Sequence, residues 1–524
     1  MVMNEPPEKT APLARRTMHA ATWRFASMAV NAVIQFGVGI VLARLLPPSE
    51  FGLAALAYLF GNFAHLLTNL GLPAAVVQRS DLTSRHIRTA FTLSVILGVL
   101  VAGLIWILAP LSVYVFDEPR LPLVLKVLAG MYVFIGIGNT AGALLQRRLD
   151  FRTLLFVSVG SYVLGYIPVS VGLAVLGYGV WALIGSRFVL VILQTILLLL
   201  FTRHPLRPLL ARIEAKNLVG FGTGRTISDV LQYLARSGDK FVVGRWLGGA
   251  TPLGLYNRAY QQMRLPTDNL GQLFTAVLFP AFAQLQGERK RLGVALLRST
   301  ELATLLSAPI MVGMVIAAPH LIVGVYGPNW AGSVEPFQVI AAAGVLATLY
   351  PIATSAVEAM GRVYAVSVRS GIFALTVIVL GLAALPWGLS GVAASVVAAH
   401  AVVYVLAVEL AVRTIGIERR EYLRAHVSGL AVASAVGLAA MPTRLILEYL
   451  GIPSLAILFV LIAVCAVAMW AGIRWLPGPL RPDLLVSDLL RSVPRLPGPI
   501  SRGLGFLLGV SLEKVPEGDM GAGE

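Results

Sequence analysis

Apolar runs of about twenty residues alternate with short polar connections along most of the 524-residue chain. Such a run is long enough for an α-helix to cross the hydrocarbon core of a bilayer. We therefore predict an all-α polytopic membrane protein with about 14 transmembrane helices. The predicted helices start near residues 22, 52, 90, 122, 154, 179, 218, 253, 292, 333, 364, 388, 426 and 452. The runs near 218 and 253 are the least apolar of the set.

The composition is also that of a membrane protein, and this affects the interpretation of the excess of basic residues. Only 13% of the residues are charged and the mean hydropathy is +0.81, whereas soluble domains carry about 25% charged residues. Lys and Arg number 41 against 25 acidic residues. In a soluble protein this excess would suggest nucleic acid, but no aromatic-and-basic module accompanies it. We expect no nucleic-acid partner and attribute the excess to membrane topology.

The basic residues alternate from one side of the predicted membrane to the other. With a cytoplasmic N-terminus, they gather in the connections after every second helix, as in Arg147, Arg148 and Arg152. The opposite connections are short and hold few of them, namely Arg44, Arg120, Arg245 and Arg444. Because cytoplasmic loops collect Lys and Arg, both termini are predicted to be cytoplasmic.

Two stretches indicate an internal repeat. "VLARLLPPSEFGLAALAY" at 41–58 and "VGRWLGGATPLGLYNRAY" at 243–260 share a Gly/Pro-rich turn, a Gly-Leu pair and a final Ala-Tyr. The offset is about 200 residues, or six helices, and an even offset preserves orientation in the membrane. The sequence therefore predicts two parallel six-helix lobes around a central cavity, followed by two extra helices.

The remaining features set the predicted boundaries and exclude several chemistries. Cys465 is the single cysteine and the seven histidines are scattered, so we expect no disulfide, no metal site and no cofactor. The N-terminal segment lacks the short apolar core of a signal peptide. We predict a cytoplasmic arm at 1–19, an N-lobe at 20–203, an inter-lobe loop at 204–217, a C-lobe at 218–413, the two extra helices at 414–476 and a cytoplasmic Pro-rich, amphipathic tail at 477–524.

Several blocks resemble, in the same order, the polysaccharide flippases of the multidrug/oligosaccharidyl-lipid/polysaccharide exporter superfamily. They are "IVLARLLPPSEFGLAALA", "LLQRRLDFRTL", "SGDKFVVGRWLGGATPLGLYNRAYQQMRLP" and "LFPAFAQLQ", and the resemblance covers roughly residues 20 to 415. It implies two lobes in a V and transport, by alternating access, of an undecaprenyl-pyrophosphate-linked oligosaccharide across the inner membrane for capsule, exopolysaccharide or O-antigen synthesis. It also implies three kinds of partner: this lipid-linked substrate, membrane lipids, and the polysaccharide polymerase and export machinery. We expect a monomer without enzymatic activity.

The segment near 218 carries five charged residues between 225 and 240. On a helix these charges fall on one stripe with a glutamine, formed by Arg225, Asp229, Gln232, Arg236, Asp239 and Lys240. A charge at the bilayer centre costs roughly 2.5–3.5 kcal/mol, so the stripe must face a water-filled cavity or a partner helix. Two interpretations stay open. The charges form the internal salt bridges Arg225–Asp229 and Arg236–Asp239, or they line a cavity that binds an anion.

Taken with the resemblance, the second interpretation assigns roles to individual residues. Arginine matches phosphate oxygens, so the predicted pyrophosphate site is Arg24, Arg225, Arg236, Lys240 and Arg264. Amide and tyrosine groups suit sugar hydroxyls, and the predicted sugar site is Asn31, Gln35, Gln232, Asn257, Tyr260 and Gln261. Asp229 and Asp239 are candidates for coupling to a proton or Na⁺. A break at Pro266 is expected to expose backbone groups to the cavity. Arg24 is equally well explained as an interfacial anchor.

Two other functions compete with this one. A drug or cation exporter of the same superfamily would have an acidic, aromatic cavity, whereas the predicted cavity is rich in Arg and Lys. A membrane-embedded glycosyltransferase would use a loop acid such as Asp117 or Glu118 as a base or metal ligand. The short connections on that side hold no domain that could bind an acceptor, which disfavours the enzyme.

Overall fold

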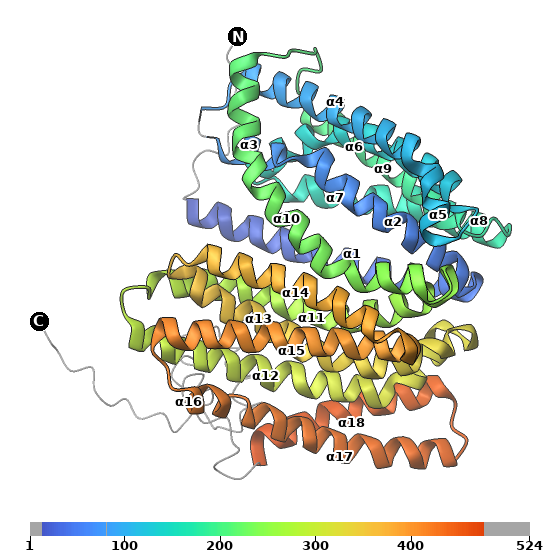
Figure 1. The fold of residues 1–524 in the computed structure, drawn as a ribbon, viewed down its shortest axis with the longest axis vertical. Coiled ribbons are helices and arrows are strands. Elements are labelled where there is room, and N and C mark those ends of the chain that lie inside the picture. The colour runs from blue at the N-terminus through green and yellow to red at the C-terminus, as the bar shows by residue number, and fades with distance from the viewer. Residues whose placement is uncertain (1–12, 80, 476–524) are drawn as a thin grey trace, which may run out of the picture. The chain divides into compact units, whose positions relative to one another are not determined.

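Every regular element in the described part of the chain is helical (Figure 1). The computed structural model describes residues 13–79 and 81–475. The side chains at 13–22, 24–29, 218–229, 231 and 232 also fall outside the description, together with those of a few single positions. The predicted tail at 477–524 therefore lies outside the described residues. The all-α class predicted from the apolar runs is confirmed.

The chain divides into two compact units, Met1–Asn257 with Val377–Leu389, and Arg258–Thr376 with Ser390–Glu524. Unit 1 contains α1 (Leu13–Leu45), α2 (Pro48–Asn69), α3 (Leu72–Gln78), α4 (Ser84–Leu108), η1 (Ala109–Leu111), α5 (Ser112–Phe116), α6 (Leu121–Arg147), α7 (Phe151–Ser161), the π-helical turn η2 (Tyr162–Tyr166), α8 (Ile167–Val175), α9 (Trp181–Thr202), α10 (Arg212–Trp246), the start of α11 (Ala250–Gln284), the end of α14 (Val363–Ala383), η5 (Leu385–Trp387) and the first residues of α15 (Gly388–Ile415). Unit 2 contains the remainder of α11, α14 and α15, together with α12 (Arg289–Pro319), the π-helical turn η3 (His320–Gly324), η4 (Pro328–Ser333), α13 (Val334–Ala359), α16 (Arg419–Arg424), α17 (Val427–Tyr449) and α18 (Ser454–Trp475).

Eleven helical segments of the described chain are long and apolar enough to cross a membrane. Each coincides with one of the predicted runs, and α1 adds a shorter apolar segment, Val30–Leu45. Helices α10 and α11 are each 35 residues long but too polar to qualify by composition. These are the two runs that the sequence marks as weakest. The protein is a multi-pass membrane protein, while the total of fourteen spans stays a prediction.

Unit 1 is built around α6, which packs between α4 and α9, with α2 also against it (Figure 1). Small residues allow the close approach of these helices. A Cβ atom on Gly98 or Gly136 would overlap the backbone of the neighbouring helix. Helix α10 packs against α2, α3 and α4. The polar segment near 218 therefore lies on three helices of the first repeat.

The connection between α9 and α10 is fixed to α4. The Arg88 guanidinium donates to the carbonyl oxygens of Arg207 at 3.0 Å and Pro208 at 3.3 Å. One turn earlier, Arg85 forms a 2.9 Å ion pair with Glu214 in the first turn of α10. These contacts explain why α10, although it opens the second repeat, belongs to unit 1.

The two copies of the predicted repeat meet in unit 1 at a pair of glycines. Helix α2 begins at Pro48 and α11 begins at Ala250, the same position in both copies. A Cβ atom on Gly52 would overlap the carbonyl oxygen of Ala250, and one on Gly254 would overlap the carbonyl oxygen of Pro48. Each contact is the repeat-related mate of the other, as in an isologous interface. We call this contact the reciprocal glycine crossing; it requires the absence of a side chain at both glycines.

A carboxylate beside this crossing joins three connections of unit 1. Glu50, in the first turn of α2, pairs with Arg120 at 2.8 Å and accepts a hydrogen bond from the Val180 backbone N–H at 2.6 Å. Arg120 also pairs with Glu118 at 3.2 Å. The ends of α2, α6 and α9 are thereby held together on the side that the charge pattern predicts to be extracytoplasmic.

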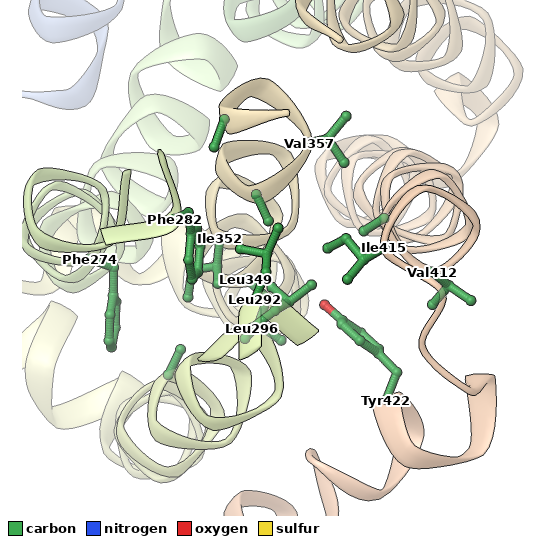
Figure 2. Packing of buried hydrophobic residues seen from close by; sticks show 14 of the residues in the cluster. Phe274, Phe282, Leu292, Leu296, Leu349, Ile352, Val357, Val412, Ile415 and Tyr422 are labelled. Atoms are coloured by element: carbon green, nitrogen blue, oxygen red, sulfur yellow. The ribbon is translucent and has the colours of Figure 1, made fainter. Parts of the chain in front are cut away.

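Unit 2 has its own apolar core. Figure 2 shows side chains from α11, α12, α13, α15 and α16 converging in one cluster. Phe282 and Leu292 are fully buried there, and Tyr422 is 1% exposed. Elsewhere in this unit α12 packs along α13 and α17, and α17 packs against α18.

Candidate functional site

The predicted stripe of α10 divides into a buried and an exposed part. Arg236 is exposed, Lys240 is half-buried and Asp239 is only 2% exposed. The side chains of Arg225, Asp229 and Gln232 lie outside the described residues. Within the described residues Arg236 forms no ion pair with Asp239, so the second of the two internal salt bridges considered above is absent.

Asp239 is a buried carboxyl group with one hydrogen bond. Its Oδ2 accepts from the Tyr256 hydroxyl at 2.7 Å, and Tyr256 itself is fully buried. Its Oδ1 accepts no hydrogen bond from the described residues. A buried carboxylate is costly unless it is protonated or paired with a cation. Asp239 thus joins α10 to the start of α11 and has one oxygen left for a proton or a metal cation.

The predicted residues of α11 fall into both units. Asn257 is half-buried in unit 1. In unit 2 the Arg264 guanidinium pairs with Asp268 at 2.7 Å and lies 6.0 Å from the centre of the buried Tyr260 ring. Gln261 is exposed. Arg264 is therefore held by an acid and a ring within its own helix.

The expected break at Pro266 is wrong, because α11 continues without interruption from Ala250 to Gln284 with Pro266 and Pro280 inside it. A proline costs one backbone hydrogen bond, which membrane helices tolerate when neighbouring groups compensate. The backbone near Pro266 is therefore not an opening for ligands.

The candidates on α1 are only partly described. The Asn31 amide oxygen accepts from the Ser158 hydroxyl at 3.1 Å, which ties α1 to α7. Gln35, one turn further along, is exposed. The side chain of Arg24 lies outside the described residues.

A polar stripe on α2 was missed by the sequence analysis. Tyr58, Asn62, His65 and Asn69 recur at helical spacing inside an apolar span. The Asn69 amide oxygen accepts from Asn139 of α6 at 2.8 Å, and its nitrogen lies 3.0 Å from the His65 ring. The spacing was visible in the sequence, but the stripe carries no carboxylate or guanidinium and a search for charges passes over it.

The comparisons with known proteins agree on one class. Residues 41–335, more than half of the chain, match the family described as "Polysaccharide biosynthesis protein". The chain is 28% identical over 356 residues to the teichuronic acid biosynthesis protein TuaB of Bacillus subtilis (strain 168), covering 67% of this chain and 72% of that protein. It is 27% identical over 350 residues to the lipopolysaccharide biosynthesis protein WzxC of Escherichia coli (strain K12), covering 64% and 68%.

Among solved structures, the fold is similar to that of the lipid II flippase MurJ in an inward closed conformation. The TM-score is 0.66 at 13% sequence identity, over 87% of this chain and 98% of that one. At this identity the likeness concerns the fold alone. It confirms the all-α polytopic membrane fold that the apolar runs and the resemblance predict.

Proposed function

Because this chain belongs to the polysaccharide biosynthesis protein family, we propose that it flips undecaprenyl-pyrophosphate-linked oligosaccharide units across the cytoplasmic membrane. The family match carries the proposal. It runs from the last turns of α1 to the first turn of α13 and so includes most of unit 1 and the start of unit 2. The lipid tail of such a substrate stays in the bilayer while its polar head crosses, which requires a polar path through apolar helices and no covalent chemistry. In this role the protein is a transporter and not an enzyme.

We assign the predicted site residues to two parts of the substrate, the pyrophosphate and the sugars. Arg24, Arg225, Arg236, Lys240 and Arg264 would hold the pyrophosphate, because guanidinium groups form paired hydrogen bonds with phosphate oxygens. Asn31, Gln35, Gln232, Asn257, Tyr260 and Gln261 would contact sugar hydroxyls. The exposure of Arg236 and the absence of an Arg236–Asp239 ion pair among the described residues support the cavity interpretation over the internal salt bridge.

A cation exporter is disfavoured by the distribution of acids. Between residues 51 and 202 the acidic residues are confined to connections and are Asp81, Asp117, Glu118 and Asp150. The spans in that range contain none. A cationic drug would meet no fixed negative charge in these spans, whereas an anion would meet the cation Arg187.

The first prediction tests the site in cells. We expect Arg236→Ala combined with Lys240→Ala to abolish polysaccharide export in a strain whose own flippase is deleted, with normal protein levels in the membrane. The matched control is Arg289→Ala with Lys290→Ala, which removes an exposed Arg–Lys pair at the start of α12 and is expected to leave export unchanged. Normal export by the α10 variant would refute the site, and its loss from the membrane would mean that the pair is structural.

The second prediction concerns ion coupling at Asp239. We expect Asp239→Asn to reach the membrane folded, yet to lose the dependence of flipping on an imposed proton or Na⁺ gradient, because the amide cannot exchange a cation at Oδ1. The measurement is the translocation of a fluorescent lipid-linked sugar in proteoliposomes. Tyr256→Phe removes the 2.7 Å hydrogen bond but keeps the carboxyl group, and should keep the gradient dependence. A variant Asp239→Asn that still responds to the gradient would exclude Asp239 as the coupling group.

A further inference from the structure

Arg187 is the one charged residue of α9, in a span with a mean hydropathy of 2.3. Its side chain is exposed within unit 1. Among the described residues it forms no ion pair and donates no hydrogen bond. A cation left in a membrane span without a partner costs roughly 2.5–3.5 kcal/mol if it faces acyl chains. Such a residue is therefore a candidate for a functional site.

The surroundings of Arg187 place its charge well inside the helices. The Tyr58 hydroxyl of α2 donates at 3.4 Å to the carbonyl oxygen of Leu183, one turn before Arg187 in α9. At a rise of 1.5 Å per residue, Tyr58 and His65 lie about 15 and 25 Å from the start of α2 at Pro48. An arginine that reached out to the headgroups would have its neighbours at the helix ends. Arg187 instead lies one turn from a contact with Tyr58, a residue of the α2 polar stripe.

A distorted helix also packs against α9. The π-helical turn η2, which begins at Tyr162 and ends at Tyr166, packs against α9, where a Cβ atom on Gly165 would lie 3.6 Å from the Cα atom of Leu190. The ring centroids of Tyr162 and Tyr166 are 4.6 Å apart, so the two phenols are stacked beside each other. π-Helical turns are rare and are frequent at functional sites. Aromatic faces and phenol hydroxyls are the groups on which sugar rings pack and form hydrogen bonds.

No fixed acid of these spans neutralises the cation. The spans between residues 51 and 202 contain no acidic residue. The nearby amide Asn69 is already bonded to Asn139. An anion bound beside Arg187 would supply a negative charge that these spans lack.

We propose that Arg187, the stacked pair Tyr162 and Tyr166, and the α2 polar stripe form a binding site within unit 1 for an anionic carbohydrate group. The guanidinium binds a carboxylate or phosphate oxygen, and the phenol and amide groups contact the hydroxyls of the same sugar. The inference rests on the proposed function for the identity of the carbohydrate, and it adds a substrate contact in α9 to those predicted in α1, α10 and α11.

The test is direct binding by the full-length protein in nanodiscs of uncharged lipid. The probes are inorganic pyrophosphate, glucuronate and glucose, and the readout is the rise in unfolding temperature with probe concentration, which gives the dissociation constant by linkage. We expect at least one of the two anions to bind ten-fold or more tightly than glucose. Preference for glucuronate would identify an acidic sugar as the ligand, and preference for pyrophosphate would identify the diphosphate.

The variants separate this site from a general effect of charge. Arg187→Gln should weaken binding of the preferred anion at least ten-fold, and Arg187→Lys should weaken it less, because a lysine keeps the charge but loses the planar fork. The matched control is Lys126→Gln, which removes a different cation from a span of unit 1. The Lys126 ammonium lies 4.8 Å from the centre of the Trp106 ring. This variant should bind the anion as tightly as the parent protein does. Equal binding of glucose and both anions, or unchanged affinity in a folded Arg187→Gln protein, would overturn the proposal. Because binding is measured without transport, normal export by the α10 variant would refute the pyrophosphate site on α10 and leave this result standing.

Discussion

Replacing Gly52 or Gly254 with alanine is expected to destabilise the protein by about 3 kcal/mol or more, among the largest effects of any single methyl group in this chain. The added Cβ would overlap a backbone carbonyl oxygen, Ala250 in one case and Pro48 in the other. A side chain could rotate away, but a carbonyl inside a helix moves only with the helix. The first turns of α2 and α11 must therefore separate, and the contact between the two repeats opens.

A control glycine and a double variant distinguish this effect from a general effect of adding a methyl group. Gly103→Ala, in α4, adds a methyl group where nothing lies within 4 Å, and should be neutral or slightly stabilising because alanine favours the helix. The double variant should be little worse than either single variant, because one methyl group already opens the crossing that the two glycines share. Thermal unfolding of the purified variants provides the measurement. Strictly additive losses at Gly52 and Gly254 would show that the two contacts are independent.

Much of the architecture was readable from the sequence because the bilayer imposes it. A chain in hydrocarbon must satisfy its backbone internally, so an apolar run of sufficient length is a helix whatever its neighbours are. The same reasoning is weakest for α10 and α11, whose charges make them poor spans by composition although each forms a helix of 35 residues. There the repeat was the stronger signal, since the turns before Pro48 and Ala250 occupy the same place in both copies.

The candidate site was less predictable because burial depends on partners from other helices. The helical wheel placed Arg236 and Asp239 on one stripe, yet Asp239 is buried against Tyr256 while Arg236 is exposed. The spacing of polar residues within α10 does not predict this difference in burial. The sequence gives Arg187 little weight for the related reason that a single charge in an apolar helix forms no pattern. Its significance comes from Tyr58, Tyr162 and other residues distant in sequence.

The structural role of Arg258 also depends on partners that are distant in sequence. It occupies α11 among polar residues that the sequence associates with a cavity, but in unit 2 it is 7% exposed and its guanidinium lies 4.5 Å from the Tyr326 ring and 4.6 Å from the Trp330 ring. Trp330 is fully buried in η4, and Tyr326 accepts a hydrogen bond from Gln262 at 2.7 Å. The cation thus fixes the connection between η3 and α13 onto α11.

Arg258→Ala is accordingly expected to destabilise the protein by about 3 kcal/mol, because it removes a buried cation–π contact and leaves a cavity beside two aromatic rings. Arg258→Met keeps most of the volume and removes the charge, and should recover part of that loss; the remaining deficit, about 1–2 kcal/mol, measures the cation–π contribution. Arg258→Lys should fall between methionine and the parent, since the ammonium cannot stack as a plane. These values come from chemical denaturation followed by Trp fluorescence. If Arg258→Met were as stable as the parent, the side chain would act through packing alone and its charge would contribute nothing to unit 2.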